Sequence, residues 1–172
     1  NDAMNNVYVR FPEGERGRPI VQLDAHLDEV GFMITAVTDE GFLKVAPVGG
    51  LDKRLMPGLE VTVHGKEELF GIFTSIPPHL LKDEDRKKPA EIEDLSVDIG
   101  LSKEEAQQLV SPGDTVTVRR NPVFLQNNCL SAKALDGRAG CAVIARAAEL
   151  LKDNSLNCDV TLLFSVQEEV GG

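Results

Sequence analysis

The last part of the chain combines a helix pattern with a strand that has almost no polar residue. From Arg138 to Leu151, apolar residues recur at the spacing of one helix face. The run that follows, Val160 to Val166, is nearly continuous in apolar residues, as in a strand buried on both faces. A helix that leads into such a strand is typical of an α/β layer with crossover connections. We therefore predict an α/β layer here.

The first 47 residues contain four short strand patterns. Val7 to Phe11 and Ile20 to Leu23 flank the turn-forming run Pro12 to Pro19, so we expect the chain to open with a hairpin. Gly31 to Val37 and Phe42 to Val45 form a second predicted pair.

After Pro47 the chain becomes rich in Gly and Pro, and its apolar runs become short and β-branched. Such runs predict a small barrel or sandwich. The runs are Glu60 to Val63, Leu69 to Phe73 and Thr115 to Val118. One helix is predicted among them, beginning at Ser102, because Ser102 and Glu105 form a capping box.

Together these patterns predict a three-layer α/β domain built from both ends of the chain. Residues 1–47 and 126–172 would form this domain, and residues 48–125 would form an inserted β-rich domain. Within the insertion, Lys82 to Lys88 is so dense in mixed charge that we expect an exposed, mobile loop.

Charge and composition narrow the function classes. The formal net charge of −10, from 28 acidic and 18 basic residues, disfavours a nucleic-acid partner. No apolar run approaches the roughly 18 residues of a membrane span, and no leader pattern is visible, so we expect a cytoplasmic protein without a membrane partner. Cys129, Cys141 and Cys158 show no CxxC spacing, and we expect them to be reduced and mostly buried.

An imidazole and several carboxylates stand at the ends of predicted elements. His26 and Asp28 follow the second strand, and Glu168 and Glu169 follow the last strand. Asp136 lies at the N-terminus of the predicted helix. The carboxyl ends of strands are where ligands gather in an α/β sheet. Nitrogen and oxygen donors of this kind suit zinc, cobalt or manganese. We therefore predict a metal site.

Each of these residues also has an ordinary structural interpretation. His26 fits a hydrogen-bonded polar residue, Asp136 a helix N-cap, and the Glu168–Glu169 pair a solvated strand end. However, adjacent acids in extended chain point to opposite faces and repel one another unless a cation lies near. Asp28 would share a face with His26 in extended chain and orient its imidazole.

Several separated motifs together resemble the M42 family of metallo-aminopeptidases, which includes glutamyl aminopeptidases and tetrahedral aminopeptidases. The similarity extends over nearly the whole chain, in order and in strand context. The motifs are Asp24 to Gly31, Ala134 to Arg138 and Gln167 to Gly171, with Pro77 to Leu80 and Val97 to Gly100 in the insertion.

The resemblance implies a pair of metal ions, zinc or cobalt first among them, that share Asp136 as a bridging carboxylate. His26 would bind one ion and Glu169 the other. Glu168 would be the general base for a metal-bridging hydroxide that attacks a peptide carbonyl, and Asp28 would support His26. The substrates would be peptides, which lose single N-terminal residues. The family pattern assigns no metal to His79, and His64 is interpreted as a surface residue.

The resemblance also implies homo-oligomers, from dimers to dodecameric tetrahedral shells, assembled through the inserted domain. It calls for two further ligands, an acid and a histidine, downstream of Glu169. We therefore expect these 172 residues to be a fragment of a longer peptidase, without the N-terminal helix and the C-terminal half. With three ligands, the chain alone should bind metal weakly or at one site and be inactive.

Two other functions stay open from the sequence. A related dinuclear hydrolase, such as a deacylase or a carboxypeptidase, would use the same bridging-acid chemistry. A non-enzymatic assembly module would use the β-rich insertion, with a vestigial Glu168–Glu169 site. Neither side-chain preference nor the identity of the metal follows from the residues present.

Overall fold

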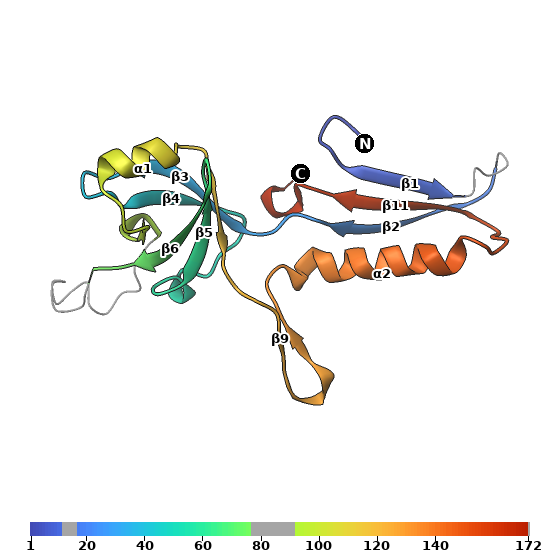
Figure 1. Cartoon of the computed structure of the whole chain (residues 1–172). Helices are drawn as coiled ribbons and strands as arrows, with labels where there is room; N and C mark the ends of the chain where they lie inside the picture. The colour runs from blue at the N-terminus through green and yellow to red at the C-terminus, as the bar shows by residue number, and fades with distance from the viewer. Residues whose placement is uncertain (12–16, 77–91, 172) are drawn as a thin grey trace. The chain divides into compact units, whose positions relative to one another are not determined.

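A computed structural model describes residues 1–11, 17–76 and 92–171. The chain divides into two compact units, which we describe separately (Figure 1). The first unit contains Asn1–Glu29 and Ala132–Gly172, and the second contains Val30–Ser131. No helix in the described part is both long and apolar enough to cross a membrane.

The first unit is a three-stranded sheet with a long helix against it. The strand order is β1 (Val7–Phe11), β11 (Asp159–Ser165) and β2 (Ile20–His26), and the helix α2 (Leu135–Leu151) contacts β2 (Figure 1). Strands β11 and β2 are parallel, whereas β1 and β11 are antiparallel. The predicted opening hairpin is therefore wrong: the apolar strand β11 lies between β1 and β2, where it hydrogen-bonds on both edges.

The core of this unit lies between the sheet and α2. Ile144 of the helix is buried with Val160 and Leu162 of β11, and Leu23 and Ala25 of β2 pack against them. The other residues of β11, from Leu163 to Ser165, are half-buried. We expected an incomplete three-layer domain, and in the described residues this sheet carries one α-helix, which gives two layers. The mixed α/β class itself is confirmed.

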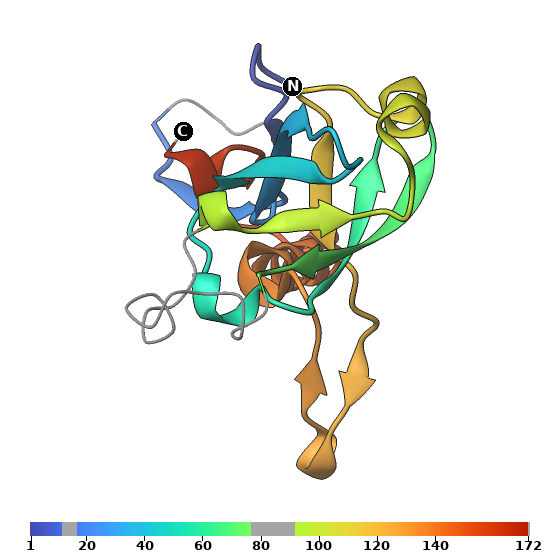
Figure 2. The same ribbon diagram turned by 90° about the vertical axis from the view of Figure 1, so that its left-hand side faces the viewer.

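The second unit is a closed antiparallel barrel with strand order β3-β4-β7-β6-β5-β8 (Figure 2). The strands are β3 (Gly31–Val37), β4 (Leu43–Val48), β5 (Glu60–His64), β6 (Glu68–Thr74), β7 (Ser96–Asp98) and β8 (Thr115–Val118). The rings of Phe32 and Phe73 pack at 4.7 Å between centroids inside it. Alternate apolar residues point inward along each strand, which is how a small barrel fills its interior.

Short elements complete the second unit. Helix α1 (Lys103–Leu109) begins at Ser102 with the predicted capping box and buries Ala106. Strands β9 (Val123–Phe124) and β10 (Leu130–Ser131) form a hairpin around the 3-10 turn η4 (Gln126–Asn128). Two other 3-10 turns, η1 (Lys53–Leu55) and η3 (Ile92–Asp94), connect barrel strands.

The barrel begins earlier in the sequence than we expected. Strands β3 and β4 belong to it, although we had placed residues 30–47 in the α/β domain. The reason is hydrogen bonding: β3 pairs with β8 and β4 pairs with β7, so the barrel cannot close without them. The Pro77 to Leu80 motif, with His79, and the charged run Lys82 to Lys88 lie outside the described residues.

The histidine of the barrel and the cysteines have ordinary surroundings. A ring nitrogen of His64 lies 2.9 Å from the Thr117 hydroxyl, so this half-buried histidine is a partner within the barrel wall. The three cysteines are free: Cys141 is buried, Cys158 is half-buried and Cys129 is exposed.

Candidate metal centre

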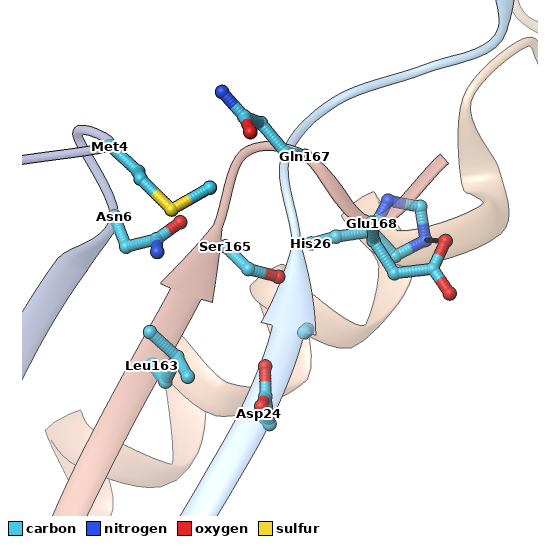
Figure 3. A pocket seen from close by; sticks show the side chains of 9 residues that line it. Met4, Asn6, Asp24, His26, Leu163, Ser165, Gln167 and Glu168 are labelled. Atoms are coloured by element: carbon cyan, nitrogen blue, oxygen red, sulfur yellow. Dashed lines mark ion pairs between the residues drawn. The ribbon is translucent and has the colours of Figure 1, made fainter. Parts of the chain in front are cut away.

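The candidate site lies where the parallel strands β2 and β11 end side by side. His26 is the last residue of β2, and its register partner Ser165 is the last residue of β11. Beside them is a hollow of about 390 Å³, lined also by Asp24, Leu163 and Glu168 (Figure 3). All lining residues belong to the first unit. The predicted position at the carboxyl ends of the strands is therefore the observed one.

His26 is buried, and each of its ring nitrogens faces an oxygen atom. Nδ1 lies 3.2 Å from the carbonyl oxygen of Asp28, an acceptor, so in the neutral ring this nitrogen carries the proton. Nε2 lies 3.3 Å from Asp136 Oδ1 and 3.9 Å from Glu168 Oε2. Both of these oxygens are acceptors, so without a metal Nε2 makes this contact as a donor, in the protonated ring. With a metal ion between Nε2 and the carboxylates, the lone pair of Nε2 would be directed at that ion.

The Asp28 side chain connects the two strand ends. Its Oδ1 accepts the backbone N–H of Glu168 at 3.3 Å, and its Oδ2 accepts that of Glu169 at 3.1 Å. Oδ1 also lies 3.4 Å from His26 Nδ1. The N-cap residue Gln167 makes no capping hydrogen bond of its own, so Asp28 satisfies these N–H groups instead. Asp28 therefore orients both glutamates in addition to the predicted contact with His26.

The sequence predicts extended chain at Glu168 and Glu169, but the structure differs there. They begin a 3-10 turn, η5 (Glu168–Val170), in which successive side chains are turned by about 120° instead of 180°. Both carboxylates can therefore approach the same point. Ligand atoms of His26, Glu168 and Glu169 all lie within 4.8 Å of one another.

Asp136 reaches the site through an unusual backbone at the start of α2. Ala134 has left-handed φ (55°), Asp136 is extended (φ −60°, ψ 124°) and Gly137 has φ 74°. The backbone of Asp136 and Gly137 is not helical, so the regular helix begins after these two residues, and the Asp136 carboxylate contacts His26. A Cβ on Gly137 would lie 2.5 Å from atoms of the His26 ring, so only glycine permits this close approach.

The charges of the site favour a cation. Burial alone would lower the pKa of His26, but the hydrogen bonds to Asp136 and Asp28 and the negative charges of Glu168 and Asp28 together raise it. One imidazole surrounded by several carboxylates is an excess of negative charge, and the donors are nitrogen and oxygen. The residues present therefore fit a divalent metal ion.

The structure brings together the residues singled out from the sequence, with one difference in grouping. We expected His26, Asp136 and Glu169 to converge, with Glu168 beside them. The mutual cluster instead contains His26, Glu168 and Glu169, and the largely exposed Asp136 carboxylate contacts His26 Nε2. Gly137 and the ion-pairing residues Glu29, Lys133 and Arg138 had been given no role. Their partners are about a hundred residues away in sequence, so no local signal revealed them.

An imidazole and converging carboxylates at the ends of parallel strands are the kind of donors that metal-dependent hydrolases use. The chain belongs to the M42 glutamyl aminopeptidase family, whose model matches residues 5–172. The resemblance indicated by the motifs is thereby confirmed.

Known relatives support this assignment. The TET1 peptidase of Pyrococcus horikoshii, which can assemble into a tetrahedron or a large octahedral shell, is 41% identical with a TM-score of 0.87, over 99% of this chain and 51% of that one. The TET aminopeptidase of Thaumarchaeota archaeon SCGC AB-539-E09 is 34% identical with a TM-score of 0.90, over 96% of this chain and 48% of that one. The glutamyl aminopeptidase of Lactococcus lactis subsp. cremoris (strain MG1363) is 29% identical over 178 residues, 99% of this chain and 50% of that protein. The chain spans about half the length of the curated relatives it matches.

Proposed function

We propose that the whole protein is a dinuclear metal-dependent aminopeptidase that removes N-terminal residues from peptides. The observation that carries this proposal is the convergence of His26, Glu168 and Glu169 within 4.8 Å at the strand ends of an M42 chain. Its M42 relatives include a protein named as a glutamyl aminopeptidase, which supports the choice of aminopeptidase over other dinuclear hydrolases.

In this proposal His26, Asp136 and Glu169 hold the metal, with Asp136 shared between two ions. When bound, zinc or cobalt would supply Lewis acidity and lower the pKa of a coordinated water. Glu168 acts as the general base, and its partly exposed carboxylate faces the side of His26 that carries Nε2. Asp28 holds both glutamates by their backbone N–H groups.

Replacing Asp136 with alanine in the whole protein is expected to abolish both zinc binding and hydrolysis of aminoacyl anilides, because each ion loses the shared carboxylate. Zinc calorimetry and a substrate panel that includes acetylated amino acids check this result. Activity on acetylated amino acids alone would favour a deacylase.

Zinc calorimetry of the 172-residue chain by itself should show one weak site, because three side chains cannot saturate two ions. Two tight sites on that chain would contradict this account.

We also infer that the protein forms homo-oligomers through its barrel unit. The P. horikoshii relative assembles into closed shells, and the outer barrel surface here exposes Met33, Phe70 and Ile72. Light scattering is expected to show a mass of at least a dimer, and Phe70→Ser should lower it. A monomer at all concentrations would contradict this inference.

A further inference from the structure

An ion cluster next to the metal centre joins the loop after β2 to the start of α2. Glu29 Oε1 lies 2.9 Å from Lys133 Nζ and 3.5 Å from Arg138 Nη2. The same guanidinium donates from Nε to the carbonyl oxygen of Leu27 at 2.9 Å. The Glu29 side chain is 16% exposed, so these two cations replace most of its water contacts. All four residues belong to the first unit.

The position of this cluster in the sequence indicates what it does. On the strand side its contacts fall immediately before and after Asp28, in the loop that also follows His26. On the helix side they fall before and after Asp136. The cluster therefore links the two backbone segments that carry the facing atoms His26 Nε2 and Asp136 Oδ1, 3.3 Å apart.

We propose that Glu29 is a positioning residue of the metal centre, which holds the His26 loop against the Asp136 segment through Lys133 and Arg138. This inference rests on the proposed function, because it concerns the same metal ligands. Glu29 itself contacts no ligand and binds no metal in this scheme. It acts by fixing the distance between His26 and Asp136, and by neutralising two cations beside a site for divalent ions.

The negative charge of Glu29 matters as much as the contacts by which it joins the His26 loop to the Asp136 segment. Without it, Lys133 and Arg138 would stand unpaired next to the metal centre and repel incoming cations through a partly buried, weakly screened region. Helix α2 also carries an exposed ion pair, Arg146–Glu149 at 2.6 Å, in which both side chains are about two-thirds exposed, unlike Glu29. Exposed pairs of this kind contribute little to stability.

Zinc affinity of the whole protein tests the proposal. Glu29→Gln keeps the shape of the side chain but removes its charge, and it is expected to weaken zinc binding by roughly 10- to 100-fold, the range for partners that orient ligands. Lys133→Met removes one cation and leaves the Arg138 link to Leu27, so its effect should be only a few-fold. The matched control is Glu149→Gln, which removes a carboxylate charge from the exposed ion pair on α2 and should bind zinc like the wild type.

Hydrogen exchange of the metal-free protein gives a second readout. The Leu27 amide donates to the Ser165 carbonyl oxygen at 2.7 Å, so its exchange rate reports opening of the loop. In Glu29→Gln this amide is expected to exchange about tenfold faster, while the amides of β11 keep their rates. A uniform increase at all amides would show a loss of global stability and would overturn the positioning role.

A failure of the proposed metal centre and a failure of the proposed Glu29 role would give different results. If His26→Ala binds zinc as tightly as the wild type, the proposed metal centre is wrong, and with it the role of Glu29. If His26→Ala loses zinc but Glu29→Gln binds it normally and keeps the Leu27 exchange rate, the metal centre stands and the positioning role is overturned.

Discussion

Replacing Glu168 with glutamine in the whole protein is expected to reduce kcat by about 10³-fold, within the usual range for losing a general base, while zinc affinity stays within a few-fold of wild type. Glutamine is nearly the same size and keeps the N–H that Asp28 accepts, so the backbone of η5 should not move. It cannot accept a proton at neutral pH. Steady-state hydrolysis of aminoacyl anilides and zinc calorimetry measure the two quantities.

This substitution separates two roles for Glu168. The structure places its carboxylate in one cluster with His26 and Glu169, a position that a ligand would also occupy. If zinc affinity falls together with turnover, Glu168 is a ligand and not the base. Near-normal hydrolysis would exclude both roles. Glu149→Gln, on the exposed face of α2, is the control and should change neither quantity.

The second large effect is expected from Gly137→Ala, which should abolish zinc binding although it adds one methyl group. The new Cβ would lie 2.5 Å from atoms of the His26 ring, closer than any real contact, so either His26 or Asp136 must move. A residue with a side chain is also strained at φ 74° by about 1–3 kcal/mol. Zinc calorimetry together with thermal unfolding measures both consequences.

Gly58→Ala is the matched control for this experiment. Gly58 also has positive φ (82°), but nothing lies within 4 Å of its Cβ position. It should therefore lose a similar amount of stability and keep its zinc affinity. If Gly137→Ala loses stability but binds zinc normally, the contact between Gly137 and His26 does not matter for the metal centre.

The agreement between sequence and structure is best where neighbouring residues decide the outcome. The mostly apolar run Gly31 to Val37 predicts strand β3 with its observed bounds, and the Ser102–Glu105 capping box predicts the start of α1. Helix α2 and strand β11 were predicted within a few residues. These signals are local, because side-chain periodicity and capping depend on residues a few positions apart.

The conformation of Glu168 and Glu169 was predicted wrongly because it depends on a residue far away in the sequence. Extended chain was a natural continuation of β11, but the Asp28 side chain accepts the N–H groups of Glu168 and Glu169 from 140 and 141 residues away. That contact favours a 3-10 turn, and the turn brings both carboxylates toward His26. A pattern read along the chain contains no information on such a partner.

The sequence by itself determined the chemistry of this protein: which residues are able to ligate a metal, which runs form strands and helices, and the family to which the motifs point. Tertiary structure alone decided that β11 lies between β1 and β2, that β3 and β4 close the barrel, and that Glu29 pairs with Lys133 and Arg138. The physical reason is that hydrogen bonds between strands and ion pairs between distant segments depend on which surfaces meet after folding, whereas ligand chemistry belongs to each side chain before the chain folds.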